Sequence, residues 1–124
     1  MDEKTSRFDL EDRLLDYVAN IVRLAESIRR SPAGTHVANQ MLRSGTAVLP
    51  NHGEAQAAES NADFIHKLSI CLKELRETRR WLRLIQRVPL IPKPDIVLPL
   101  LAETEELIRI FFSSLKTARK KGTK

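Results

Sequence analysis

Apolar residues recur along most of this chain with the alternating spacing of four and three residues that is typical of helices packed in a bundle. One run has Leu14, Val18, Ile21, Ala25 and Ile28, and a second, richer in small residues, has Ala38, Met41, Gly45, Val48, His52 and Ala55. A third has Phe64, Leu68, Cys71, Leu75, Thr78, Leu82 and Ile85, and a fourth has Val97, Leu101, Thr104, Ile108, Phe111 and Leu115. No alternation of period two, which would favour a β-strand, interrupts these runs. The pattern therefore predicts four helices, each burying one face.

Prolines and glycines separate the four runs. Residues 31–34 read Ser-Pro-Ala-Gly, residues 88–94 contain three prolines, and Ser60 with Asp63 resembles a helix N-cap. We expect helices over about residues 9–30, 34–58, 61–88 and 95–119, with a basic C-terminal tail over 116–124. Because short connections make consecutive helices antiparallel neighbours, the sequence predicts a single all-α domain over residues 1–124, an antiparallel up-down-up-down four-helix bundle. Pro50 should kink the second helix, or else divide it in two.

Some apolar residues lie outside these runs. A wide core-facing stripe explains those that flank a run, such as Leu15, Val22 and Trp81. Ile70 and Leu84 instead point sideways or outwards, and an exposed apolar strip usually marks a contact with a partner. We therefore expect the chain to form a homo-oligomer.

Charge is distributed unevenly. The chain carries 21 basic and 16 acidic residues, a net charge of +5, and the last nine residues supply five bases and no acid. Residues 1–16 contain six acids against three bases, whereas residues 64–94 contain eight bases against two acids. One face or end of the fold should therefore be basic, which favours an anionic partner such as nucleic acid.

The third helix carries the most distinctive basic pattern. Its outward positions include five successive cations three or four residues apart, Lys73, Arg76, Arg80, Arg83 and Arg87. This pattern indicates contacts with nucleic-acid phosphates. The alternative is an ordinary solvated face on which Glu77 pairs with Lys73 and Arg80.

The C-terminal tail offers a second set of candidate nucleic-acid contacts, namely Lys116, Arg119, Lys120 and Lys121. Cations in a last helical turn can instead complement the helix dipole, and a lysine-rich terminus can simply be solubilising. No zinc-finger spacing, helix-turn-helix signature or RNA-binding aromatic motif accompanies either set, so the sequence gives no support for base-specific readout.

Catalytic and metal-binding patterns find little support. His36, His52 and His66 lie in different contexts without a metal-ligand spacing, and Cys71 occupies a seam position where a small buried hydrophobe is expected. Arg30 and His36 have the spacing of a helical-bundle ribonuclease pair, but the Ser-Pro-Ala-Gly break separates them. We expect no enzymatic activity, no metal and no cofactor.

The expected location is the cytoplasm, with no membrane contact. Cys71 is the single cysteine, so no disulfide can form within the chain, which fits a reducing compartment. The first ten residues are charged and lack the apolar region of a signal peptide, and no apolar run is long enough to span a bilayer.

A family resemblance becomes visible between the second and third runs. Residues 42–48 read LRSGTAV, residues 51–56 include Asn51, Glu54, Ala55 and Gln56, and residues 58–70 include AES and ADFIHKLSI; Lys73-Glu74, Arg76-Glu77-Thr78 and Trp81-Leu82 follow. This stretch resembles the four-helix-bundle family of 23S rRNA intervening-sequence proteins. The resemblance spans about residues 10–118 and departs from the family pattern at Pro50.

The resemblance implies a ring-like homopentamer of small bundles. It also implies a relation to the accessory proteins of diversity-generating retroelements, which bind nucleic acid and a reverse transcriptase. The leading hypothesis is therefore a non-enzymatic homo-oligomer that binds RNA or DNA through phosphate contacts, as an accessory to an rRNA or reverse-transcriptase system. The alternative is a protein-only scaffold whose basic surface serves a protein partner.

Overall fold

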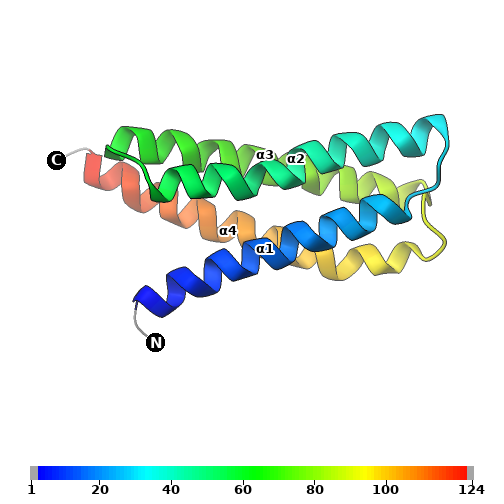
Figure 1. Ribbon diagram of the computed structural model, residues 1–124, viewed down its shortest axis with the longest axis horizontal. Helices are drawn as coiled ribbons and strands as arrows, with labels where there is room; N and C mark the ends of the chain where they lie inside the picture. Colours follow the sequence, from blue (N-terminus) through cyan, green and yellow to red (C-terminus); the bar gives the residue numbers. More distant parts are fainter. Residues whose placement is uncertain (1–2, 123–124) are drawn as a thin grey trace.

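The fold is an elongated all-α four-helix bundle, seen in a computed structural model that describes residues 3–122 and the side chains from residue 10 onward (Figure 1). Its elements are α1 (Glu3–Ser27), α2 (Pro32–Gln56), α3 (Asn61–Arg87), a 3₁₀ turn η1 (Pro94–Ile96) and α4 (Val97–Gly122). Consecutive helices run antiparallel, and no strand occurs within residues 3–122. The predicted fold class is confirmed.

Local sequence signals set where the helices begin. Ser31 is the N-cap of α2 and its Oγ accepts a 3.0 Å hydrogen bond from the Gly34 nitrogen. The hydroxyl of Ser60 caps α3 in the same way, accepting from the Asp63 nitrogen at 3.1 Å, as the sequence predicted. An N-cap side chain satisfies one of the amide donors that a helix start leaves without a partner. The largest departure from the expected bounds is in α1, which begins at Glu3 and ends at Ser27.

The core is built from the predicted apolar runs. In α3, every member of its run except Phe64 is buried, and Cys71, Leu75, Leu82 and Ile85 are fully enclosed. Phe64 and Ala38 are half-buried. The runs omitted Tyr17 and Leu24, which are also buried, because α1 packs with a face wider than a single seam.

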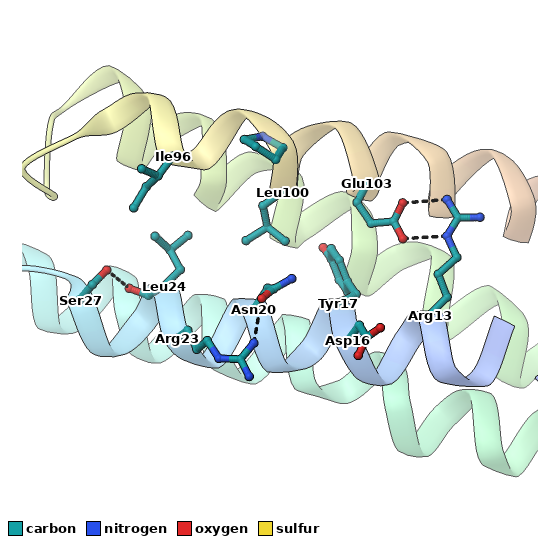
Figure 2. Close-up of a pocket in the computed structure, with 11 residues that line it drawn as sticks. Arg13, Asp16, Tyr17, Asn20, Arg23, Leu24, Ser27, Ile96, Leu100 and Glu103 are labelled. Carbon is teal, nitrogen blue, oxygen red and sulfur yellow. Dashed lines mark hydrogen bonds and ion pairs between the residues drawn. The ribbon is translucent and has the colours of Figure 1, made fainter. Parts of the chain in front are cut away.

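The start of α4 differs from its predicted register. Leu100 is buried and Leu101 is only half-buried, whereas the run placed Leu101 in the core. The reason is the position of α1, because Leu100 lines the groove that α4 forms with that helix (Figure 2). From Thr104 onward the predicted positions are buried.

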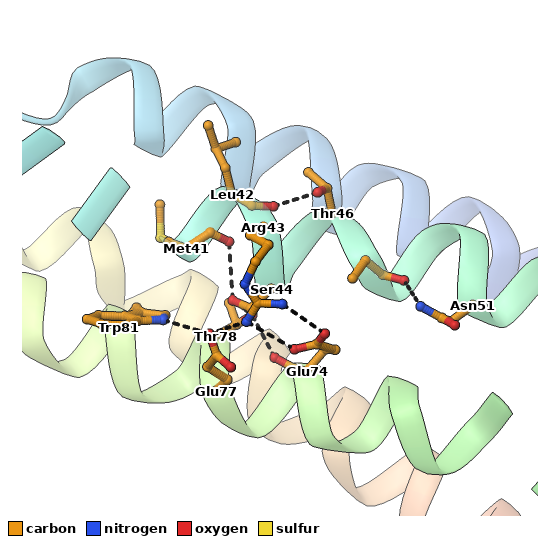
Figure 3. A network of polar contacts seen from close by, with 11 residues as sticks. Met41, Leu42, Arg43, Ser44, Thr46, Asn51, Glu74, Glu77, Thr78 and Trp81 are labelled. Atoms are coloured by element: carbon orange, nitrogen blue, oxygen red, sulfur yellow. Dashed lines mark hydrogen bonds and ion pairs between the residues drawn. The ribbon is translucent and has the colours of Figure 1, made fainter. Parts of the chain in front are cut away.

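Helix α2 is continuous through Pro50, so the alternative of two separate helices is wrong. Pro50 lies on an exposed face, where its ring meets solvent instead of the core. Next to it, the Asn51 side chain donates a 2.8 Å hydrogen bond to the Ala47 carbonyl of the same helix (Figure 3). This bond does not replace the amide that Pro50 lacks, because the acceptor for that amide would be the Thr46 carbonyl.

Two hydroxyl pairs cross the core between neighbouring helices. Ser44 of α2 lies 2.8 Å from Thr78 of α3, and the Tyr17 hydroxyl of α1 lies 2.7 Å from Thr104 of α4. Thr78 and Thr104 each also donate to a carbonyl one turn earlier in their own helices. All buried polar side-chain atoms of the described residues have a hydrogen-bond partner, as stable cores require.

The connections α1–α2 and α3–α4 meet at one end of the bundle (Figure 1). There the Arg29 nitrogen donates to the Leu90 carbonyl at 3.0 Å, and the Arg29 guanidinium donates to the Pro89 carbonyl at 2.7 Å. Leu90 and Ile91 turn inward and close the core. These contacts hold the two loops together and bring their charged residues to the same end.

Several apolar side chains stay on the surface. Among the described residues, the large exposed hydrophobic residues are Leu15, Val22, Leu84, Val88, Ile96, Leu98 and Phe112. Ile70, expected to point outward with Leu84, is half-buried instead. None of the helices in residues 3–122 combines the length and the apolar character needed to cross a membrane.

Candidate nucleic-acid interface

The five cations of the predicted basic pattern, which we call the α3 stripe, lie on the outer surface of the bundle. They are Lys73, Arg76, Arg80, Arg83 and Arg87, and all are exposed. At 1.5 Å per residue, the stripe extends about 21 Å along the helix. Within residues 10–122, none of the five forms an ion pair. The stripe therefore presents a row of solvated cations along one side of a rigid helix.

Glu74 and Glu77, the acids of α3 nearest the stripe, contact α2 (Figure 3). Arg43 of α2 lies 3.2 Å from a carboxylate oxygen of Glu74, which is only 6% exposed, and also bonds Glu77. The Trp81 indole donates a further hydrogen bond to Glu77 at 3.1 Å. Contact with Arg43 holds the pKa of the Glu77 carboxyl below its ordinary value, so that carboxyl stays ionised.

The ion pairs of Arg43 argue against the alternative interpretation of the stripe as an ordinary solvated face. Glu77 was the residue expected to neutralise Lys73 and Arg80 on a solvated face, but its ion pair is with Arg43. Lys73 is near enough to contribute weakly to the low pKa of Glu77 without forming an ion pair with it. The other cation of this helix segment, Arg79, pairs with Glu105 of α4 at 3.1 Å. Glu74, Glu77 and Arg79 therefore form ion pairs with other helices, and these ion pairs do not neutralise the cations of the stripe.

The end of the bundle where the α1–α2 and α3–α4 connections are bonded through Arg29 adds cations that sequence reasoning missed. Arg30 and Lys93 lie in the two connections at the end of the bundle where α3 finishes, together with Arg29, and Arg83 and Arg87 lie on the last turns of α3. Residues 29–36 and 83–96 hold five bases and one acid, and Arg30 and Lys93 are exposed. We call this region the basic end. The basic end could have been predicted from the sequence, because an up-down-up-down topology places the first and third connections at the same end of the bundle.

The C-terminal cations lie at the opposite end of the bundle. Lys116, Arg119, Lys120 and Lys121 are exposed, and the Asn61 side chain at the start of α3 donates to the Ala118 carbonyl at 2.9 Å. Because the stripe begins twelve residues after Asn61, Lys73 is about 18 Å further along the bundle. The structure therefore does not merge the two predicted sets into one patch. Lys124 lies outside the described residues.

A groove between α1 and α4 has a volume of about 510 Å³ (Figure 2). Arg13 closes one side through a two-pronged ion pair with Glu103, each arm 2.7 Å long. The Tyr17 hydroxyl at its floor is bonded to Thr104, and burial raises the pKa of that hydroxyl. Arg13, Glu103 and Tyr17 are therefore engaged in holding the two helices together, while Arg23 donates to Asn20 of its own helix at 2.9 Å.

The residues weighed for catalysis lie apart. His52 is buried with its ring edge-to-face against Phe111, at a centroid distance of 5.9 Å. Burial raises the pKa of the Cys71 thiol to about 12, so it is a neutral core residue, as its seam position indicated. Arg30 and His36 lie on either side of the α2 N-cap. In the described part of the chain, no three His, Cys, Asp or Glu side chains gather as metal ligands would.

Comparison with known proteins agrees with this geometry. The sequence matches the family described as 23S rRNA-intervening sequence protein over residues 9–113. The chain belongs to that family. We therefore interpret the bundle and its surfaces as those of a member of this family.

A solved structure supports the assignment. A protein of unknown function from Bacteroides thetaiotaomicron, assigned to the S23 ribosomal protein family, is 34% identical to this chain. The match covers 86% of this chain and 94% of that protein, with a TM-score of 0.78. No curated protein matches the sequence.

Proposed function

We propose that this member of the 23S rRNA-intervening sequence protein family is a non-enzymatic homo-oligomer that binds nucleic acid through phosphate contacts. The observation that carries the proposal is the exposed α3 stripe, five cations on one side of a helix without an ion pair among the described side chains. Phosphate contacts give affinity without sequence specificity, which fits a surface that lacks base-reading motifs.

The stripe and the basic end form the proposed binding surface. Arg83 and Arg87 belong to both, and the connections that carry Arg30 and Lys93 meet at the end of the bundle where α3 finishes. The neighbouring acids, Glu74 and Glu77, are drawn to Arg43 of α2. A polyanion following this surface would meet cations along most of its length and little opposing charge.

Self-association is the second part of the proposal, and a pentamer is the favoured state. Leu15 and Val22 are exposed one heptad apart on α1. Exposed aliphatic residues one heptad apart on a helix are typical of a surface that another subunit covers. Light scattering should then give a mass several times the 14.1 kDa of the chain, with about 70 kDa expected for the pentamer, and a monomer would contradict this part.

Oligomerisation also strengthens the proposed binding. A ring repeats the α3 stripe in every subunit, so one polyanion can engage several weak sites at once. The cellular role we propose is that of an accessory to an rRNA or reverse-transcriptase system. That role is consistent with the family of the chain.

The test is the salt dependence of binding. Fluorescence anisotropy with labelled RNA and DNA, at several salt concentrations, should show affinity falling steeply with salt for both nucleic acids. Absence of binding at low salt would contradict the proposal. That result would favour a protein-only scaffold, the alternative to which the exposed aliphatic residues point. Binding to a protein partner through an apolar interface would respond only weakly to salt.

A further inference from the structure

Phe112 is an exposed aromatic residue on the outer side of α4. It is 51% exposed, and among the large exposed hydrophobic residues in the described chain it is the one with a ring. The other six are Leu15, Val22, Leu84, Val88, Ile96 and Leu98. A wide core-facing stripe does not account for Phe112, because its neighbour Phe111 already fills the core at 1% exposure.

The surroundings of Phe112 are cationic. Phe112 lines a shallow groove of about 400 Å³ with Lys116, Arg119 and Lys120, which follow it by four, seven and eight residues and so share its helix face. From Leu107 to Gly122 the helix has no acid. The last acid before this segment, Glu106, holds Arg109 at 2.6 Å. The ring therefore lies beside three cations on one face of its own helix.

We propose that Phe112 is a stacking platform for an unpaired base of single-stranded nucleic acid, with Lys116, Arg119 and Lys120 contacting the adjoining phosphates. This rests on the nucleic-acid binding proposed above and specifies its form at the C-terminal end of the bundle. An aromatic ring beside a row of cations matches the two parts of a single strand, a flat apolar base and an anionic backbone. In a duplex the base faces are stacked on one another, so they are not available for stacking on the Phe112 ring.

Charge complementarity favours a single strand over another copy of the same surface. An interface made from the same patch on two subunits would bring Lys116, Arg119 and Lys120 against their own copies, and like charges facing each other disfavour association. A ring joins two unlike surfaces, so the oligomer mass of the Phe112 variant tests whether this groove is a subunit contact. A single strand supplies both an apolar face and the opposite charge. The two ends of the bundle then differ: the α3 stripe and basic end offer phosphate contacts alone, and the Phe112 groove also engages bases.

The experiment compares ligands that share phosphates but differ in bases. Fluorescence anisotropy is measured with a labelled oligothymidine, an abasic strand of the same length and a duplex. Phe112→Leu keeps an apolar side chain and the net charge but removes the ring. It should weaken oligothymidine binding about 5- to 150-fold and leave the abasic strand, the duplex and the salt slope unchanged. Phe112→Trp should retain oligothymidine binding.

The control is Leu98→Ala, which trims a residue of similar exposure at the other end of α4 and should change none of the three affinities. Equal weakening for all three ligands, or no weakening for oligothymidine, would overturn the stacking proposal. A lower oligomer mass in Phe112→Leu would also overturn it, because Phe112 would then belong to a subunit contact. Duplex binding by the parent with no effect of Phe112→Leu refutes stacking alone, whereas no binding of any ligand refutes both proposals.

Discussion

Gly45 of α2 packs against Ile21 of α1, and replacing it with alanine tests how closely these two helices approach. A Cβ at this position would lie 2.8 Å from Ile21 Cγ2 and 3.3 Å from Cγ1. Carbon atoms normally meet at about 3.5–4.0 Å, so one of the two helices or the isoleucine must move. Ile21 is 0% exposed, and its branched side chain has one strongly preferred rotamer in a helix. It therefore has little room to adjust.

The expected magnitude follows from two opposing effects. Overpacking a core of this kind costs about 1–3 kcal/mol, while alanine gains about 0.8–1 kcal/mol over glycine in helix propensity. Gly45→Ala should therefore be neutral to destabilising by roughly 2 kcal/mol. Gly53, in the same helix, has no atom within 4 Å of its virtual Cβ. Gly53→Ala should then stabilise the protein by about 0.5–1 kcal/mol and serves as the matched control.

The assay is chemical denaturation of both variants at one protein concentration, because association contributes to apparent stability. Their free energies of unfolding should differ by about 1–3 kcal/mol, with Gly45→Ala the less stable. In an Ile21→Ala background the obstructing atoms are gone, so Gly45→Ala should become stabilising as well. Equal stabilisation by the two single variants would refute the close contact between α1 and α2.

Three further outcomes are expected. Leu75 is fully buried in α3, so Leu75→Ala should cost roughly 2–5 kcal/mol of unfolding free energy. Leu84→Ala, on the surface of the same helix, should cost far less, and a loss below about 1 kcal/mol for Leu75→Ala would contradict the core register. Burial lowers the pKa of His52, so as pH falls below about 6.5 the imidazole takes up its proton more readily in the unfolded chain than in the folded one. The melting temperature should therefore drop between about pH 7 and 5.5, and the drop should be smaller in His52→Leu. Removing the α1–α4 ion pair with Arg13→Gln should cost only about 1 kcal/mol or less, because both partners are partly exposed, and a much larger loss would mean that α1 depends on it.

The helices and most of the core could be predicted from the sequence because burial on one face imposes a period that tertiary contacts rarely change. Leu75, Thr78 and Leu82 are buried as their spacing required. The register failed near Leu100, where the groove with α1 decides which residue is covered, and spacing within one helix contains no information about that neighbour. The spacing favoured a continuous α2 with a kink at Pro50 over two helices, but a pattern within one segment does not show whether packing carries a helix through a proline.

The candidate site was predictable where it depends on one helix and unpredictable where it depends on several. The exposure of Arg76 and Arg83 follows from their outward positions on α3. That Glu77 would pair with Arg43 could not be inferred, because the two residues are 34 positions apart and several cations of α3 itself were nearer in sequence. The separation of the stripe from Lys116 appears only once the antiparallel packing is known. Nucleic-acid binding at these residues stays a prediction.

The most direct test of the proposed function removes the centre of the α3 stripe. Changing Arg76, Arg80 and Arg83 together to Gln should leave helicity and oligomer mass intact, because all three are exposed and form no ion pair with a described side chain. The charge-matched control changes Arg23, Lys67 and Arg109 to Gln outside the stripe. It also breaks the Lys67–Glu54 and Arg109–Glu106 ion pairs, so its helicity and oligomer mass are checked together with those of the stripe variant.

The measurement is the slope of the logarithm of the binding constant for duplex DNA against the logarithm of salt concentration. Each lost phosphate contact should reduce this slope by about 0.9, so the stripe variant should lose roughly 2–3 units of slope together with affinity for both RNA and DNA. The control variant should keep a slope close to that of the parent. An unchanged slope and affinity in the stripe variant, or an equal loss in the control, would contradict binding through the α3 stripe.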